Sequence, residues 1–234
     1  MSLRYFVTGT DTEIGKTTVA AGLLHAARIR GLSTAAVKPV AAGCERTVAG
    51  LRNDDALTLM AECSPPLEYD LLNPVALEPA IAPHIAAAEA GLTLSAQQLA
   101  QACFKAFDRR ADLTLVEGAG GWRVPLNDQQ TLADLAIALG EPVILVVGLR
   151  LGCINHALLT AEAIAADGLQ LAGWVANQVD PQMDRQQHNL DTLKALMPAP
   201  LLGVVPRLTP LSMAGIAGHL RLDALLGATS GLSL

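Results

Sequence analysis

The sequence predicts an α/β fold, in which a mostly parallel β-sheet carries helices on both faces within a single domain spanning residues 1–234. Six short runs are apolar at consecutive positions and not at alternate ones, which is typical of strands covered on both faces. Stretches with the helical spacing of apolar residues separate these runs. Strands that alternate with helices are joined by right-handed crossovers, so the strands are expected to be parallel.

Each predicted element takes its bounds from these patterns. The strands, in chain order, are Tyr5–Val7, Thr34–Val37, Leu113–Val116, Val143–Val147, Leu171–Val175 and Leu201–Val205. The helices are Thr17–Arg30, Asp54–Ala61, Ser95–Arg109, Leu132–Leu139, Ala157–Ala166 and Gln186–Leu196. The proline-rich segment Ser64–Pro83 is expected to be a long loop that covers a site.

Composition excludes several classes of function. Apolar residues make up 51% of the 234 residues and charged residues 16%, which suits a globular core that needs no disulfide. Aromatic residues are only 3% and the net charge is −6, so a nucleic-acid partner is not expected. The longest strongly apolar run, Val143–Leu149, is too short to cross a membrane, and cysteines without metal-ligand spacing indicate free thiols. We expect a cytoplasmic protein with no membrane partner.

A phosphate-binding loop is the clearest motif. Gly9 to Thr17 reads GTDTEIGKT between a predicted strand and a predicted helix. Backbone N–H groups at such a helix start attract phosphate, Lys16 adds a positive charge, and the Thr17 hydroxyl binds magnesium. The spacing is one residue longer than the standard P-loop motif, which displaces the first glycine. A plain strand-to-helix turn with a solvated lysine is the alternative.

Charged residues follow the second predicted strand. Lys38 stands at the end of that strand, and Pro39 after it stops the strand. A cation at this position could stabilise an anionic reactant or a migrating phosphoryl group. A lysine that only reaches solvent is the alternative. Asp54 suits the N-cap of the next helix, whereas Asp55 in its first turn is a candidate magnesium ligand. Without the phosphate loop, helix capping explains both aspartates.

Two later strands also end in polar residues. Glu117 ends the run Leu113–Val116 and precedes four residues, Gly-Ala-Gly-Gly, that let backbone approach a ligand. Its carboxylate is placed to complete a magnesium shell, and a simple turn is the alternative. Asn177 follows the fifth strand, where its amide is a candidate to read a purine edge. Asparagine is common in any such turn, so this signal is weak alone.

Eight segments, taken together, resemble dethiobiotin synthetases. They are GTDTEIGKT, VKPVAAG, GLRNDDA, NPVALEPAIAPH, LVEGAGGWRVPL, VILVVGLRLGCINHALLTAEAI, AGWVANQVD and PAPLLGVVP. The match runs from Met1 to about Pro206, and P-loop proteins in general lack the EGAGGW and LGCINHALLTA strings. The resemblance implies a P-loop NTPase-like fold and an ATP- and Mg²⁺-dependent ring closure, which joins CO₂ to 7,8-diaminopelargonic acid to form dethiobiotin in biotin biosynthesis.

The resemblance also implies roles for matching residues. The catalytic groups are Lys38, Lys16 and Thr12. The magnesium ligands are Thr17, Asp55 and Glu117. The other nucleotide-binding positions are Glu13, Ile14, Gly15, Thr18, Gly118, Ala119, Gly120, Asn177, Gln178, Pro206, Arg207 and Leu208. The family is implied to form a homodimer, in which a helix start of the partner subunit holds the substrate carboxylate. The residues that match this helix start are Gly152, Cys153, Ile154 and Asn155.

The chain departs from the family pattern at two places. Ala42 stands where relatives often carry a hydroxyl residue that touches the substrate, so that side-chain contact is missing here. The acidic residue expected near Met213 for the nucleotide is absent, which predicts a looser nucleotide preference.

Two other classes of protein are alternatives to this prediction. A nucleotide-switch ATPase of the partitioning or cell-division type has the same fold, but it places a second lysine early in the loop, where this chain has Asp11. Such proteins also tend to carry basic membrane- or DNA-binding elements, which are absent here. An amidotransferase synthetase related to cobalamin synthesis needs a glutaminase domain, for which no segment has a suitable length or Cys/His arrangement.

Overall fold

A computed structural model describes residues 2–227 and contains a six-stranded parallel sheet, in the order β10-β9-β8-β1-β7-β2. Every neighbouring pair of strands in it is parallel. The strands are β1 (Leu3–Gly9), β2 (Thr34–Val37), β7 (Leu113–Gly121), β8 (Val143–Gly148), β9 (Leu171–Asn177) and β10 (Leu201–Val205). The parallel sheet predicted from the sequence is confirmed.

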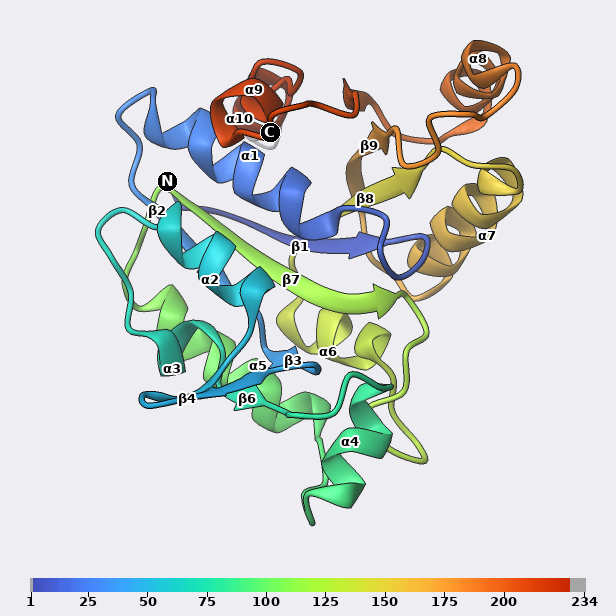
Figure 1. The fold of residues 1–234 in the computed structure, drawn as a ribbon. Coiled ribbons are helices and arrows are strands. Elements are labelled where there is room, and N and C mark those ends of the chain that lie inside the picture. The colour runs from blue at the N-terminus through green and yellow to red at the C-terminus, as the bar shows by residue number, and fades with distance from the viewer. Residues whose placement is uncertain (1, 228–234) are drawn as a thin grey trace, which may run out of the picture.

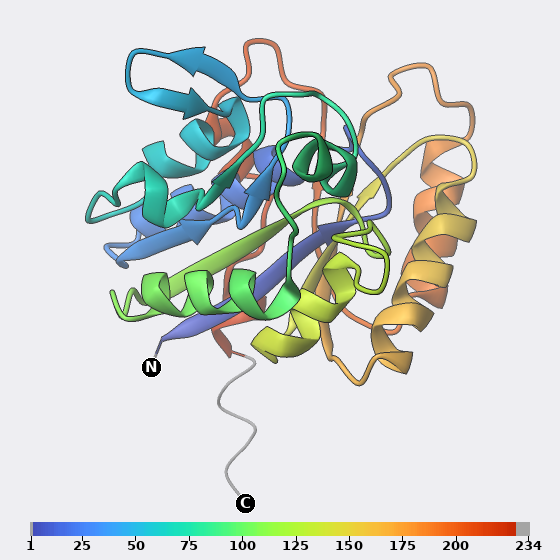
Figure 2. The same ribbon diagram turned by 90° about the horizontal axis from the view of Figure 1, so that it is seen from below.

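Helices cover both faces of the sheet, as Figure 1 and the view from below in Figure 2 show. One face carries α1 (Lys16–Arg28), α2 (Asp54–Ala61), α9 (Met213–Ala217) and α10 (Asp223–Leu226). The other face carries α5 (Ala96–Phe107), α6 (Leu132–Leu139), α7 (Cys153–Ala166) and α8 (Gln186–Leu196). Two short helices, α9 and α10, therefore lie in the described part of the tail after Leu208.

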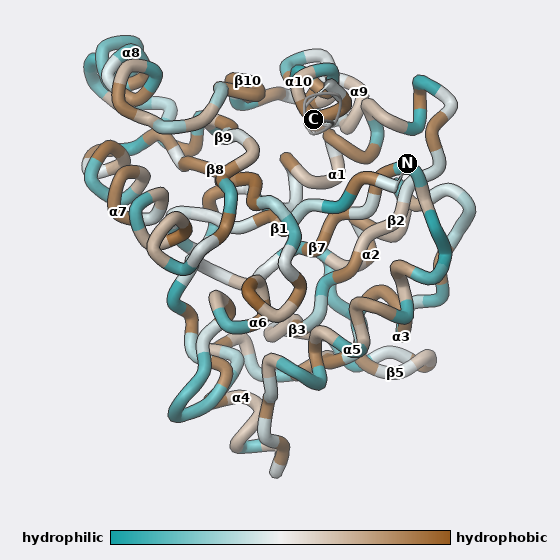
Figure 3. The backbone as a smooth tube through the Cα atoms, turned by 180° about the vertical axis from the view of Figure 1, so that it is seen from behind, coloured by the Kyte–Doolittle hydropathy of each residue, from teal (hydrophilic) through white to brown (hydrophobic). Residues whose placement is uncertain are grey.

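Two covered faces explain the consecutive apolar residues in the strands. In β1, Tyr5 and Val7 pack into the cluster formed with α1, while Phe6 between them packs into the cluster formed with α5 and α6. Side chains alternate across a strand, so a strand buried on both faces needs an apolar residue at each position. Figure 3 shows this as brown, hydrophobic stretches along β8 and β9, whereas α8 at the periphery carries more hydrophilic residues.

The segment between β2 and β7 is more regular than predicted. Residues 64–83 were expected to form a long loop, and this is wrong, because α3 (Tyr69–Leu72) and β6 (Val75–Ala76) lie within it. β6 pairs in parallel with β3 (Val40–Ala41), and β4 (Glu45–Thr47) forms an antiparallel hairpin with β5 (Gly50–Arg52). The helix α4 (Pro83–Glu89) follows. Elements of two to four residues are too short for a periodic pattern to reveal.

Strand β7 is longer than predicted and carries the glycine-rich segment within the sheet. The sequence predicts a strand that ends at Val116, but the pairing with β1 continues through Val7↔Glu117 to Gly9↔Gly121. Sheet context outweighs the low strand propensity of glycine here. Glu117 is thus held in the sheet and not in a mobile turn.

Within residues 2–227, no helix combines the length and apolar character that a membrane crossing requires. This part of the chain also holds four free, buried cysteines, Cys44, Cys63, Cys103 and Cys153.

We predict that the native protein resists thiol reagents near neutral pH. Burial raises the pKa of the Cys63 thiol to about 11 and that of Cys103 to about 12, so both stay protonated and unreactive well above neutral pH. A chromogenic disulfide reagent should label neither thiol in the native state and all four cysteines in denaturant. Rapid native labelling of Cys63 would contradict this packing.

Candidate active site

The phosphate loop connects β1 to α1 at the carboxyl edge of the sheet. Glu13 and Gly15 both have a positive φ, 57° and 83°, and α1 begins directly afterwards at Lys16. The first N–H groups of a helix have no partner within it, so together with the helix dipole they attract phosphate oxygens. Gly9, the displaced first glycine, lies in β1, and a Cβ there would come within 3.0 Å of the Lys16 Cδ atom. Its absence leaves room for the lysine stem.

Asn177 supports this loop from the end of β9, which β8 separates from β1. Its Nδ2 donates a hydrogen bond of 2.8 Å to the backbone oxygen of Ile14. A Cβ on Gly15 would lie only 2.1 Å from the same Nδ2 atom. The left-handed conformation and this close approach together require glycine at position 15.

Lys16 is a buried cation without a carboxylate in contact. Only 7% of the residue is exposed, and its Nζ donates to the backbone oxygen of Asp11 at 2.7 Å. Burial lowers its pKa to about 8, against the opposing field of nearby carboxylates such as Glu117. A polyphosphate beside this ammonium group would supply the negative charge that it lacks.

Lys38, Asp55, Glu117 and Thr17 meet beside the loop. The Lys38 Nζ lies 2.7 Å from Glu117 Oε1 and 2.8 Å from Asp55 Oδ2. The Thr17 hydroxyl donates to the same Glu117 Oε1 at 2.7 Å. Lys38 and Glu117 are almost fully buried, whereas about half of the Asp55 side chain is exposed. The structure thus brings together residues from β7, α1, α2 and the end of β2.

The two lysines of the site have opposite pKa shifts. Burial alone would lower the pKa of Lys38, but the carboxylates of Glu117 and Asp55 outweigh it and hold the pKa above its ordinary value. Burial likewise works against the ionised form of Asp55, yet the charge and hydrogen bond of Lys38 leave the pKa of that carboxyl below its usual range. Lys38 is consequently a fixed cation near neutral pH.

The donor set at this cluster suits Mg²⁺. Glu117 Oε2 is buried and has no hydrogen-bond partner, so it is an acceptor without a donor. Thr17 and Asp55 place a hydroxyl and a second carboxylate around the same point. Across residues 2–227, no group of three or more His, Cys, Asp or Glu side chains is arranged to hold a metal by itself. Mg²⁺ typically binds one or two carboxylates and completes its shell with phosphate and water.

A cleft of about 730 Å³ opens over these groups. The phosphate loop and α1 supply Thr12, Glu13, Gly15, Lys16, Thr17 and Thr18 to its lining. The rest of the lining consists of Lys38, Ala41, Ala42, Asp55, Ala80, Ile81, Ala82, Pro83, Ala119, Gly120 and Val124. The volume lies within the usual range for small-molecule sites. The cleft brings together the predicted catalytic residues, most of the loop and two predicted magnesium ligands, Thr17 and Asp55. The third, Glu117, does not line the cleft but is bonded to Thr17 and Lys38, which do.

Several predicted residues lie outside this cleft. Ile14 is buried beneath the loop and Gly118 lies in β7 against Phe6. Asn177 is the last residue of β9, and Gln178 follows it with a side-chain amide that donates to Gln186. Pro206, Arg207 and Leu208 follow β10. The predicted carboxylate-binding residues, Gly152, Cys153, Ile154 and Asn155, form the start of α7 and do not line the cleft of their own chain.

An ion pair between Asp11 and Arg150 was missed by the sequence analysis. The Arg150 guanidinium donates to the Asp11 carboxylate, and the Asp11 backbone oxygen holds Lys16. Arg150 lies two residues after the end of β8, so the rule that sites lie at strand ends would have made it a candidate. The wall from Ala80 to Pro83 belongs to the proline-rich segment that was expected to cover a site, and this part of that expectation is confirmed.

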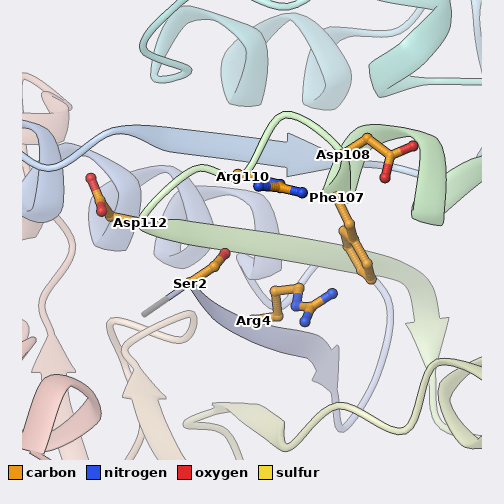
Figure 4. A pocket seen from close by; sticks show the side chains of 6 residues that line it. All are labelled: Ser2, Arg4, Phe107, Asp108, Arg110 and Asp112. Carbon is orange, nitrogen blue, oxygen red and sulfur yellow. The ribbon is translucent and has the colours of Figure 1, made fainter.

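A second cavity, of about 450 Å³, lies at the opposite end of β1 and β7 (Figure 4). Its lining residues are Ser2, Arg4, Phe107, Asp108, Arg110 and Asp112. Arg4 already pairs with Glu141 at 3.1 Å, and Asp112 accepts hydrogen bonds from Ser33. Ligands of parallel sheets bind at the carboxyl ends of strands, so this cavity is not the candidate site.

Comparisons with known proteins agree with this geometry. A family model described as an AAA domain matches residues 3–214. An ATP-dependent dethiobiotin synthetase of Pseudomonas paraeruginosa is 65% identical over 94% of this chain and 97% of its own, and one of Cellvibrio japonicus is 60% identical over 96% and 98%.

Solved structures with a similar fold are more distant in sequence. The MinC:MinD cell division complex of Aquifex aeolicus matches with a TM-score of 0.61 at 15% identity, over 100% of this chain and 98% of the other. MinD of Pyrococcus horikoshii, complexed with Mg-ADP, gives a TM-score of 0.58 at 17% identity, over 98% of both chains. At such low identity, these structures show the P-loop NTPase-like fold alone.

We predict that Lys16→Ala weakens ATP binding at least about tenfold, because a charge-assisted hydrogen bond to phosphate is worth roughly 1.5–3 kcal/mol. Calorimetric titration with Mg-ATP measures the change. Lys105→Ala, on an exposed position of α5, is the control and should bind like the unmodified protein. Equal affinities in the two variants would place the triphosphate away from this loop.

Proposed function

The chain belongs to the ATP-dependent dethiobiotin synthetase family, and from this premise we propose how its residues bring the reactants together. It is an ATP-dependent ligase that forms a carbon–nitrogen bond and makes dethiobiotin in biotin biosynthesis. The observation that carries the site assignment is the buried Lys38, whose ammonium group lies between two carboxylates next to the phosphate loop.

The proposed reaction has three steps. One amine of 7,8-diaminopelargonic acid adds to CO₂ and loses a proton, which gives a carbamate. A carbamate oxygen attacks the γ-phosphorus of ATP, ADP leaves, and a carbamic–phosphoric anhydride forms. The second amine then attacks the carbamate carbon, loses its proton and displaces phosphate, which closes the ureido ring. Since carbamate and ATP are both anions, the site must reduce their repulsion and align them.

Lys16, Lys38 and Thr12 take the catalytic roles in this proposal. Lys16 binds the β- and γ-phosphates from the loop, and Lys38 stabilises the negative charge that passes between carbamate and phosphoryl group. Thr12 lines the same cleft beside Gly120. Because Gly120 has no side chain, there is room for the Thr12 hydroxyl next to it. Their common location in one cleft supports these roles.

Thr17, Asp55 and Glu117 are the proposed magnesium ligands. The unpartnered Glu117 Oε2 and the adjoining Thr17 hydroxyl support this assignment. A Mg²⁺ ion held by these residues would neutralise part of the negative charge of the phosphates. Glu117 Oε1 meanwhile stays bonded to Lys38, so the chain holds its own cation and the metal ligands in one cluster.

We propose that the adenine end of ATP lies over the ends of β9 and β10. Asn177 adjoins the phosphate loop through Ile14, and its neighbour Gln178 is bonded through its backbone N–H to Val205 of β10. A nucleotide whose phosphates lie on the loop can extend in this direction, towards Pro206 and Leu208. The opposite direction from the loop is occupied by Lys38 and Asp55.

A homodimer is proposed to complete the substrate site. Gly152 begins α7 in a left-handed conformation, and Gly152 and Asn155 are exposed to solvent. Leu151 is 92% exposed beside them and Leu159 is 56% exposed on the same helix, which suits a surface that a second subunit covers. The N–H groups of this helix start would then hold the substrate carboxylate in the partner's cleft.

A cytoplasmic location is also part of the proposal. The four free thiols of the described chain support it, since proteins of reducing compartments keep cysteines unpaired.

We expect phosphate release from Mg-ATP to require both the diamine and bicarbonate, because the γ-phosphate is transferred to a carbamate and not to water. A coupled phosphate assay with each component left out in turn measures this. Release that continues at the same rate without the diamine would eliminate the proposed reaction.

Lys38→Ala should lower turnover about 100- to 1,000-fold and leave ATP affinity within about threefold, because Lys38 acts on charge that develops during transfer. Steady-state kinetics and calorimetric ATP titration separate the two effects, and thermal unfolding checks that the variant is folded. Undiminished turnover would remove Lys38 from the mechanism.

A further inference from the structure

The backbone of Lys38 is held by α3 and not by the central sheet. Strand β2 ends at Val37, whose partner is Val116, and Pro39 has no N–H to continue the ladder. The Lys38 N–H donates instead to the Leu72 oxygen at 2.7 Å, and Asn73 Nδ2 donates to the Lys38 oxygen at 2.8 Å. Both polar backbone groups of the lysine are thus bonded to the end of α3.

Tyr69 orients the Asn73 side chain. Its hydroxyl donates to Asn73 Oδ1 at 3.0 Å, which leaves the Nδ2 of the same amide facing the Lys38 oxygen. Asn73 is 3% exposed and Tyr69 is 8% exposed, so water does not compete for these bonds. The Arg52 guanidinium lies 4.1 Å from the centre of the tyrosine ring and covers it.

The same hydroxyl also holds the start of α2. It accepts a hydrogen bond of 2.7 Å from the Asn53 N–H, and Asn53 caps α2 by accepting from Ala56 through its Oδ1. Asp55 lies two residues after this cap, in the first turn of the helix. A third contact, from Asn53 Nδ2 to the Ala42 oxygen at 3.3 Å, reaches the cleft lining.

We propose that Tyr69 is a positioning residue for this reaction, because its hydroxyl links Lys38, through Asn73, to Asp55, through Asn53. Tyr69 is not among the residues that line the cleft. The link fixes the distance between the ammonium group and the carboxylate, which come from separate elements joined by a long segment that includes the β4–β5 hairpin. The inference rests on the roles given to Lys38 and Asp55 under the proposed function.

Tyr69→Phe is the test, because it removes the shared hydroxyl and keeps the ring under Arg52. We expect kcat to fall about 10- to 100-fold, as misplaced catalytic groups do, and the Mg²⁺ concentration for half-maximal activity to rise. The KM for ATP should stay within about twofold, since the phosphate loop has no contact with Tyr69. Kinetics at varied ATP and varied Mg²⁺ give the three values.

Tyr5→Phe is the matched control. Tyr5 is 3% exposed and its hydroxyl donates to the Leu225 oxygen at 2.9 Å, so this variant also loses a buried hydroxyl away from the cleft. It loses one hydrogen bond, whereas Tyr69→Phe loses two. Both variants should lose thermal stability, and only Tyr69→Phe should show a lower kcat and a higher Mg²⁺ requirement. If kcat and the Mg²⁺ requirement of Tyr69→Phe equal those of Tyr5→Phe, the positioning role is overturned.

A second variant keeps the test decisive if Tyr69→Phe does not fold. Asn73→Ser removes the amide that binds the Lys38 oxygen and should show the same fall in kcat with an unchanged KM for ATP. An unchanged kcat in this variant would also overturn the inference. Failure of the unmodified enzyme to release phosphate with diamine and bicarbonate would instead overturn the proposed function.

Discussion

The buried ammonium group of Lys38, shared by the carboxylates of Glu117 and Asp55, connects the parts of the molecule that form its active edge. A buried charge without a partner is costly, so the buried Lys38 and Glu117 are stable only when they are paired, and the half-exposed Asp55 adds a second partner for the lysine. They come from the end of β2, from β7 and from α2. The register of β7 against β1 and the capping of α2 by Asn53 must therefore both be correct before the lysine is satisfied.

The two lysines of the cleft are prepared for different tasks. Lys38 is neutralised by fixed carboxylates and keeps its charge, whereas Lys16 has only a backbone oxygen in contact and has a lowered pKa. A lysine without a carboxylate partner, such as Lys16, gains the most stabilisation from an arriving polyphosphate. A lysine that is already paired with carboxylates, such as Lys38, is held in place before the substrate binds. Both lysines are buried, and the carboxylate partners in contact with Lys38 but not with Lys16 are enough to explain the difference in pKa.

Much of this arrangement could be predicted from the sequence, because it depends on strong local patterns. The six central strands and the phosphate loop follow from apolar runs and from the Gly-Lys-Thr triplet, and Lys38, Asp55 and Glu117 were predicted because they follow strands or begin a helix. What was missed depends on contacts between distant segments. Tyr69 reaches Asn53 and Asn73 through a single helical turn, and Arg150 reaches Asp11 across the sheet edge. The extension of β7 through glycines is likewise set by its neighbour and not by propensity.

The contact between the Asn177 amide and Gly15 affects how nucleotide specificity can change in this enzyme. The amide lies where any side chain at position 15 would be, and it bonds to the loop at Ile14. A substitution of Asn177 that adapts the site to another base would therefore also disturb the cradle for the phosphates. With adenine placed as proposed above, base selectivity and phosphate affinity would be coupled through this one amide.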